Sequence, residues 1–294
     1  MSSPDLLLHH YPVSPFSEKV RVVMGLKGLA WRACVQPVIM PKPDLITLTG
    51  GYRRIPILQI GADLYFDSHL IIEELERRFP ERPAFLAGPA TARATAAWIE
   101  GAFFFAAVGA LFSGDWDFDD AFVQDRSALI GQPFDPAAMA QAIPASERII
   151  RRDLALLSAQ LGDGRPFLTG DRADAVDAIV FAQILFLRWG KGRTARLIDE
   201  WPALAAWEDR IARIGHGRQG PDASRADAIA IARADAQPVK AGDPVRFRYA
   251  GANSAVLEGR LLHVDDDRLS IVRTGDDGLT VRLHMPRSAG EMVA

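Results

Sequence analysis

Apolar positions in the first 40 residues alternate between the period of a strand and that of a helix. Leu6–His10 is a short apolar run that predicts a buried strand, and the apolar stripe from Val20 to Leu26 predicts a helix after it. Residues 30–38 form the next apolar run and predict a second strand. A strand, a helix and a strand in such a short length make a βαβ unit, in which the two strands run parallel.

Residues 44–80 predict a second group of elements, which are arranged differently from the βαβ unit. It predicts a short helix at residues 44–49, strands at 55–60 and 64–66 separated by Gly-Ala-Asp, and a helix that begins after Asp67-Ser68 and ends at Pro80. A parallel pair followed by a hairpin, with helices on both faces, predicts an α/β sandwich over residues 1–82.

The remaining two thirds of the chain split into a helical part and a tail. Spacing over residues 88–236 is helical and predicts a bundle of six or seven helices. The most apolar stretch, residues 94–112, contains Glu100 and many small residues, so we expect a buried helix rather than a membrane span. Residues 238–294 alternate with period two and predict four or five antiparallel strands in a small β module, which we expect to pack against the helical domain or complete a dimer.

Charge and cysteine content narrow the classes of function. The formal net charge is −3, and the part from residue 238 on carries eight Lys and Arg against eight Asp and Glu, so we expect no nucleic-acid partner. The single cysteine, Cys34, excludes an internal disulfide and argues against a cysteine-based zinc site. The first residues lack the pattern of a signal peptide, so we expect a cytoplasmic protein without a membrane partner.

One acidic stretch imitates a metal-binding loop. Asp115, Asp117 and Asp119 have the spacing that opens a calcium loop, but Asp120 stands where that loop requires Gly, and Arg126 stands where it requires Glu. We therefore expect no bound metal.

The turn after the first strand is the first candidate for chemistry. Ser14 precedes Pro15 at the predicted start of a helix, where free N–H groups favour an anion. The Ser14 hydroxyl could donate a hydrogen bond to the sulfur of a bound thiol, while the helix end lowers the pKa of that thiol. The alternative is that Ser14 is only a helix cap.

Two more candidates are predicted at the same end of the sheet. If the Ile55–Pro56 bond is cis, the main chain of Ile55 could pair with a peptide-like ligand. Asp67 could bind an amino group while Ser68 and the helix N–H groups bind the neighbouring carboxylate, which together would hold an amino-acid head group. The alternative is again a simple capping pair. Ligands gather at such strand ends and helix starts in α/β folds.

These segments together resemble soluble glutathione transferases. SPFSEKVR is similar to the active-site turn of the serine- and cysteine-type classes, RIPIL to the cis-proline segment, and FDS to the site for the γ-glutamyl group. RPFLTGDRADAVDAIVF resembles the segment that caps the buried core helix of the second domain, with Asp174 in place of the usual Ser or Thr. The resemblance covers residues 1 to about 215 and implies a thioredoxin-like N-terminal domain followed by an all-α domain.

The resemblance also implies an activity and a set of binding residues. It implies a bacterial-type transferase that takes glutathione as co-substrate, attacks a small hydrophobic electrophile, and forms a cytoplasmic homodimer. Ser14 would be the activating hydroxyl, with Tyr11 as the alternative. The glutathione site would consist of Ser14, Phe16, Lys42, Arg54, Ile55, Pro56, Asp67 and Ser68. The alternative interpretation is a non-catalytic protein of the same fold that binds ligands or partners, because function does not follow from fold.

Overall fold

The computed structural model describes residues 5–112, 118–190, 194–235, 237–250 and 255–293. Its strands are β1 (Leu6–His10), β2 (Ala30–Val35), β3 (Ile57–Ile60), β4 (Asp63–Phe66), β5 (Arg218–Gln219), β6 (Pro244–Tyr249), β7 (Val256–Val264), β8 (Arg268–Thr274), β9 (Thr280–Pro286) and β10 (Gly290–Val293). Its α-helices are α1 (Pro15–Lys27), α2 (Pro43–Thr49), α3 (Ser68–Arg78), α4 (Pro89–Trp98), α5 (Phe104–Leu111), α6 (Asp120–Ile130), α7 (Pro136–Gln160), α8 (Ala175–Arg188), α9 (Pro202–Ile214) and α10 (Arg225–Ala234). Shorter helical turns are η1 (Ile99–Phe103), η2 (Thr194–Glu200) and η3 (Arg287–Ala289).

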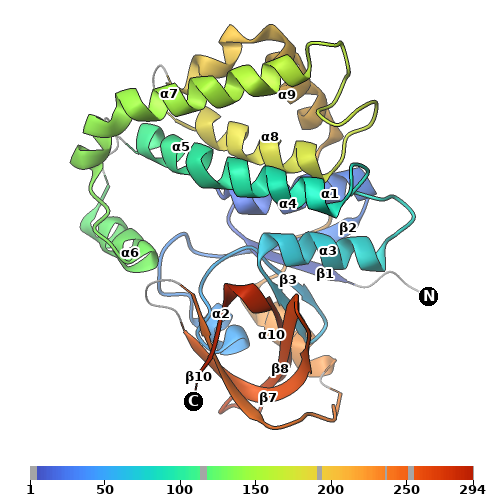
Figure 1. The fold of residues 1–294 in the computed structure, drawn as a ribbon. Helices are drawn as coiled ribbons and strands as arrows, with labels where there is room; N and C mark the ends of the chain where they lie inside the picture. The colour runs from blue at the N-terminus through green and yellow to red at the C-terminus, as the bar shows by residue number, and fades with distance from the viewer. Residues whose placement is uncertain (1–4, 113–117, 191–193, 236, 251–254, 294) are drawn as a thin grey trace.

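The N-terminal part has the predicted α/β architecture. β1 and β2 pair parallel, and β1, β3 and β4 pair antiparallel in that order. Side chains of β1 alternate between two cores, because Leu6 and Leu8 pack with α1, α3 and the helical bundle, whereas Leu7 packs on the opposite face. β3 begins at Ile57 rather than at residue 55, since Pro56 has no N–H to give to the ladder. Figure 1 shows the bundle on one side of this sheet.

The helical domain is present, with its most apolar segment in the core. Pro89–Leu111 is long and apolar enough to cross a membrane by length and composition alone. It is not a straight helix, because Gly101 has a non-helical backbone at η1, between α4 and α5. Ile99 and Phe103 are completely buried in the core that the bundle shares with α1 and α3. The segment therefore serves as core structure, as the sequence predicts.

The C-terminal strands do not form a sheet of their own. β9 pairs parallel with β4, so that the described strands form one sheet in the order β10-β6-β7-β8-β9-β4-β3-β1-β2-β5. Figure 1 shows these strands on the side of the N-terminal domain away from the bundle, which corrects the expectation that they pack mainly against the helical domain. The physical reason is the free edge of β4, whose N–H and C=O groups need partners.

A charged cluster fixes this junction. Asp63 at the start of β4 accepts two hydrogen bonds from Arg282 of β9, of 2.6 and 2.9 Å, and one from His284 at 2.8 Å. Burial raises the pKa of Asp63, but His284 and Arg282 outweigh it and hold the pKa well below its usual value.

The last helix also differs from the sequence-based expectation. The predicted helical domain extends to residue 236, yet α10 packs with α2 and the C-terminal strands in the second core, through Ala228 and Ala232. Gln59 of β3 donates a hydrogen bond to the Ala228 carbonyl at 2.8 Å. The short stripe of small residues on α10 fits closely over the sheet, which the helical period alone does not reveal.

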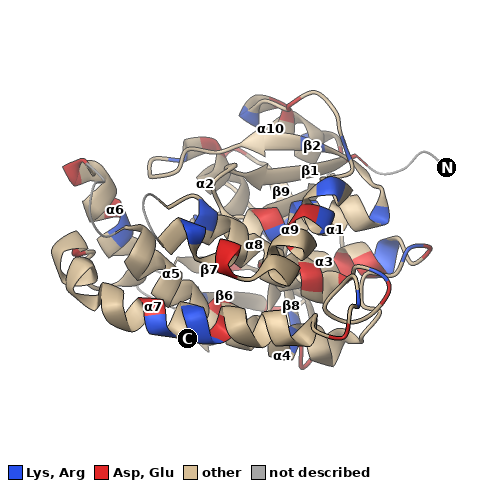
Figure 2. Cartoon of the chain, turned by 90° about the horizontal axis from the view of Figure 1, so that it is seen from above, with Lys and Arg blue, Asp and Glu red and all other residues tan. Residues whose placement is uncertain are grey.

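Charges of both signs are mixed over the helices in Figure 2.

Candidate active site

The C-terminal ends of β1 and β4 and the N-terminal start of β3 lie side by side at one end of the strands, which we call one edge of the sheet. His9 is opposite Ile57 across the β1–β3 pair, and Ile57 is opposite Phe66 across the β3–β4 pair. The register therefore brings the three predicted segments, which follow His10, precede Ile57 and follow Phe66, to the same edge. This is the convergence that the strand order predicts.

Ser14 caps α1 and keeps a hydrogen free for donation. Its Oγ accepts a hydrogen bond from the N–H of Ser17 at 3.2 Å, and its side chain is 3% exposed. The main-chain N–H of Ser14 donates to the Tyr11 carbonyl at 3.2 Å, which closes the turn. A hydroxyl that accepts one hydrogen bond still has its own hydrogen to donate. The capping and activating roles of Ser14 are therefore compatible.

The other two predicted segments have the expected local structure. The Ile55–Pro56 peptide bond is cis, as predicted. Asp67 caps α3 by accepting a hydrogen bond from the His69 N–H at 2.8 Å, and Ser68 is the buried first residue of that helix. Among the described residues, Asp67 is the one non-glycine with a positive φ, of 77°, a conformation found mainly at turns and functional sites.

The two predicted basic residues, Lys42 and Arg54, have hydrogen-bond partners in different parts of the chain. Lys42 is buried, with its Nζ 3.4 Å from the Arg53 carbonyl and 5.4 Å from the centre of the Tyr11 ring. Burial is the main cause that lowers the pKa of Lys42 to about 8, and the charges of Arg53 and Arg126 act in the same direction. Arg54 is exposed, and its Nη2 donates to the carbonyl of Ala250 at the end of β6, at 3.3 Å.

The sequence does not single out the acidic residue beside Lys42. Asp125 of α6 accepts a hydrogen bond from Arg53 at 2.5 Å and one from the Met40 N–H at 3.0 Å, and it pairs with Arg126 at 2.8 Å. It thereby ties α6 to the loop that carries Lys42. Only the fold brings together residues so far apart in sequence.

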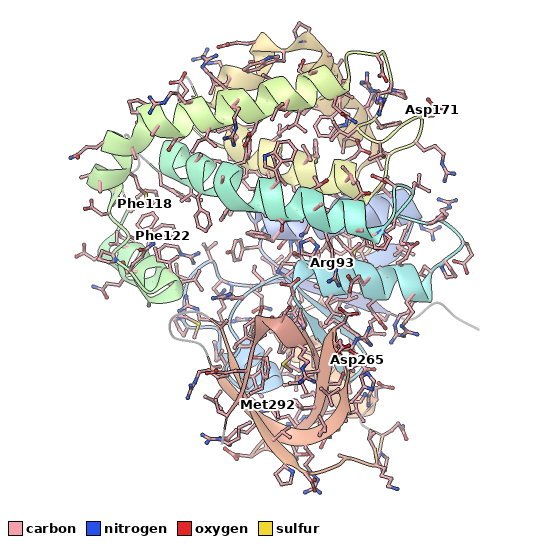
Figure 3. All side chains as sticks on the ribbon, in the orientation of Figure 1. Arg93, Phe118, Phe122, Asp171, Asp265 and Met292 are labelled. Carbon is pink, nitrogen blue, oxygen red and sulfur yellow. The ribbon has the colours of Figure 1, made fainter. Side chains whose placement is uncertain are left out.

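Aromatic side chains lie on the bundle side of the turn. Phe16 contacts Phe104 edge-on at 5.2 Å between ring centres, and Phe104 contacts Phe105, which is 68% exposed. Phe118 and Phe122 at α6 stack at 4.8 Å, and Figure 3 labels both. Phe103 is completely buried in the core and Trp98 packs against that core, so these two residues serve mainly the core.

A second group of charges, which the sequence does not predict, joins α1, α3 and the kink after α4. The completely buried Nζ of Lys19 lies 2.6 Å from Glu100 and 3.2 Å from His69, and His69 lies 3.1 Å from Glu100. Burial raises the pKa of Glu100, but Lys19 and His69 outweigh it and hold the pKa at about 2.

A cavity of about 600 Å³ lies beside this group, between α3, α4 and the C-terminal strands. Asp67 lies in its wall, and Arg93 of α4 lies 3.9 Å from Asp267 across it. Figure 3 labels Arg93 at α4 and Asp265 in the turn after β7. The cavity thus begins at the predicted head-group site.

No group of three or more metal-ligating side chains converges in the part of the chain that the structure describes. Asp115 and Asp117 of the rejected calcium loop lie outside that part.

Comparison with known proteins agrees with this geometry. The model of the glutathione S-transferase N-terminal domain matches residues 8–83, and the model of the glutathione S-transferase C-terminal domain matches residues 150–211. A solved GST-like protein from Pseudomonas syringae is similar over 99% of both chains, with 31% identity and a TM-score of 0.78. The chain belongs to the glutathione S-transferase family.

Other members of the family match a smaller share of the chain. A probable glutathione S-transferase of Oryza sativa subsp. japonica, GSTU6, is 28% identical over 210 residues, which cover 67% of this chain and 80% of that protein. The structure of rice GST1 (OsGSTU1) in complex with glutathione covers 71% of this chain and 88% of its own, with 24% identity and a TM-score of 0.52, and shows the fold alone. Relatives named as transferases, together with the two matched domains, make this chain an enzyme of the transferase class.

Proposed function

We propose that this chain is a bacterial-type glutathione transferase in which the Ser14 hydroxyl activates the glutathione thiol for attack on a hydrophobic electrophile. The observation that carries the proposal is the convergence of Ser14, Ile55 and Asp67-Ser68 at one edge of the sheet. These residues offer a hydroxyl at a helix start, a main-chain edge and a head-group site, which are the three features that a bound tripeptide thiol needs. Rice GST1, a relative of the same fold, has been solved with glutathione.

Further residues fit the remaining parts of the tripeptide. The main chain of Ile55 makes no hydrogen bond within the described part of the chain, so it is open to pair with the cysteinyl unit. Lys42 and Arg54 would face the glycyl carboxylate, and Phe16 would contact the ligand beside Ser14. Asp67 and Ser68 would hold the γ-glutamyl group.

The chemical step follows from the environment of Ser14. The thiol loses its proton to solvent, and the resulting thiolate accepts a hydrogen bond from the Ser14 hydroxyl in the positive field of the start of α1. The sulfur then uses its electron pair to form a bond with the electrophilic carbon, and the leaving group departs with its own bonding pair. Ser14 keeps its proton throughout. The aromatic surface around Phe104 and Phe105 would hold an apolar electrophile close to the sulfur.

Substitution of Ser14 tests the mechanism. We expect Ser14→Ala to lower kcat/KM roughly twentyfold at pH 7, because losing about two pKa units of thiol activation lowers the fraction of thiolate by that factor. The deficit should shrink above about pH 9, where the thiol ionises without help. The measurement is the pH profile of kcat/KM with glutathione and a nitro-activated aryl halide.

Two further variants make the result specific. Ser14→Thr keeps the hydroxyl and should restore most of the activity, while Tyr11→Phe should change it little. Melting temperatures of all three variants will show whether loss of the helix cap, worth about 1 kcal/mol, contributes. A large loss in Tyr11→Phe alone would make Tyr11 the activator, and unchanged turnover in both Ser14→Ala and Tyr11→Phe would refute the mechanism. Glutathione binding without turnover of any electrophile would favour the non-catalytic alternative.

We also propose that the enzyme is a cytoplasmic homodimer, as the family resemblance implies. Light scattering coupled to size-exclusion chromatography should then give twice the chain mass of 32.1 kDa. A mass of one chain at micromolar protein concentration would contradict this assembly.

A further inference from the structure

A buried arginine bonds to the turn that carries Ser14. Arg21 lies on α1, two helical turns after Ser14, and 8% of its side chain is exposed. Its Nη2 donates a hydrogen bond to the Pro12 carbonyl at 2.9 Å, and its Nη1 lies 3.3 Å from the Nδ1 of His10. A guanidinium can only donate, so this nitrogen of His10 is the acceptor. Arg21 therefore links α1 to the turn and to the end of β1.

The turn itself projects into solvent. Pro12 is exposed, and so is Val13, to 54%. Within the turn, the Ser14 N–H donates to the Tyr11 carbonyl. The hydrogen bond from Arg21 to the Pro12 carbonyl adds a second fixed point between these two residues, and thereby restricts where the Ser14 hydroxyl can lie.

Glu18, in the first turn of α1, holds the guanidinium in place. Its Oε2 forms an ion pair with Arg21, and its Oε1 lies 2.8 Å from the Nε2 of His216, on the segment that follows α9. The Trp31 Nε1–H donates to the His216 carbonyl at 2.7 Å and anchors that segment. Burial raises the pKa of Glu18, but His216 and Arg21 outweigh it and hold the pKa below its usual value. The Glu18 carboxylate is therefore charged at neutral pH.

This arrangement suits the control of position better than the supply of stability. A buried ion pair contributes little net stability, because the loss of hydration offsets the attraction. A guanidinium, by contrast, carries five N–H donors in one rigid plane, so it keeps its acceptors in a fixed relation to one another. A hydrogen bond to a bound sulfur needs such precision, since it weakens steeply with distance and angle.

We propose that Arg21 is a positioning residue for thiol activation: through the Pro12 carbonyl it holds the turn so that the Ser14 hydroxyl points at the sulfur of bound glutathione. Glu18 supports this role by fixing the guanidinium. The inference depends on the proposed function, because Arg21 acts through Ser14 and does not itself bind the ligand.

The pKa of the thiol of bound glutathione provides the test, followed by the ultraviolet absorbance of the thiolate as the pH is raised. We expect Arg21→Met to raise this pKa by about one unit, which lowers the fraction of thiolate about tenfold at pH values below the pKa. The dissociation constant of glutathione at about pH 5, where the bound thiol keeps its proton in both proteins, should not change.

A double-mutant cycle shows whether Arg21 acts through Ser14. Ser14→Ala alone should raise the pKa of the bound thiol by about two units. Adding Arg21→Met to it should cause no further rise, because the hydroxyl that Arg21 positions is then absent. An equal rise in both backgrounds would mean that Arg21 acts by its own charge, and would overturn the inference.

Lys27→Met is the matched control. Lys27 is a buried cation at the other end of α1, which pairs with Glu76 at 2.5 Å and donates to the carbonyls of Phe79 and Arg82, both at 2.9 Å. Its loss should lower the melting temperature and leave the pKa of the bound thiol as in wild type. Equal changes of that pKa in Lys27→Met and Arg21→Met would indicate a general structural effect and contradict the inference, as would no change in Arg21→Met.

One further variant keeps the test valid if Arg21→Met does not fold. Glu18→Gln combined with Arg21→Met removes the buried carboxylate that would otherwise lose its partner, and it is then measured in place of the single variant. If Ser14→Ala raises the pKa of the thiol and the Arg21 variant does not, only the inference fails. If glutathione does not bind, or if Ser14→Ala leaves the pKa of its thiol unchanged, the proposed function fails as well.

Discussion

Asp177→Ala will lower the free energy of unfolding by about 5 kcal/mol, a large part of the total stability of a typical domain. The Asp177 carboxylate is completely buried and accepts hydrogen bonds from the Leu168 N–H at 2.9 Å, the Trp207 Nε1–H at 2.7 Å and the Asp174 N–H at 3.0 Å. Removing it leaves three buried donors without partners, each of which costs about 1–3 kcal/mol. Urea denaturation followed by fluorescence and circular dichroism will measure the loss.

The same capping arrangement occurs at an exposed helix start and provides a matched control. Ser224 and Asp227 form a reciprocal capping box at the start of α10, as Asp174 and Asp177 do at α8. Asp227→Ala exposes the freed N–H to water, so we expect a loss of about 1 kcal/mol. Equal losses in the two variants would show that burial does not set the cost.

Glu100→Gln will lower the free energy of unfolding by about 3–5 kcal/mol, because it leaves the buried ammonium of Lys19 without a counter-ion. Glu73→Gln on the adjacent helix is the control. It breaks an ion pair with Arg93, of which 57% of the side chain is exposed, and such surface pairs contribute about 0–1 kcal/mol. A double variant, Lys19→Met with Glu100→Leu, should be more stable than Glu100→Gln alone. If Glu100→Gln is no less stable than Glu73→Gln, the buried pair has no structural role.

The pH dependence of stability gives an independent check on Glu100. Its pKa is held at about 2 in the folded chain, below its ordinary value of 4.5. The unfolded chain therefore binds more protons between these values, and stability from this group is present above about pH 4.5 and is lost as the pH falls towards 2. The shift corresponds to roughly 3 kcal/mol. Wild type should lose more stability over this range than Glu100→Gln, and parallel curves would contradict the assignment.

The order of the elements and their capping residues could be predicted because they depend on local interactions. The apolar run Leu6–His10 is correctly predicted as a buried strand, and Leu7 and Leu8 lie in opposite cores because successive side chains of a strand point to opposite faces. Ser14 and Asp67 are expected as helix caps, and both are. A cap and its N–H partner lie two or three residues apart, so the sequence contains the whole interaction.

The partners of the charged groups could not be predicted in this way. Lys19 and Glu100 are separated by 81 residues, and Asp63 and Arg282 by 219. On the sequence alone each looks like an ordinary surface charge, since a charged residue is expected at the surface unless a partner is known. The role of Asp125 was missed for the same reason.

The sequence by itself determined that residues 1–82 form an α/β domain, that a helical domain follows, and that the tail is made of strands. It did so because hydrophobic period, turns and caps act over a few residues. Only the tertiary structure decided that the tail continues the N-terminal sheet at β4 and packs Tyr249 against Tyr52. Which free strand edge a segment pairs with depends on the whole packed chain, because every strand offers the same N–H and C=O groups.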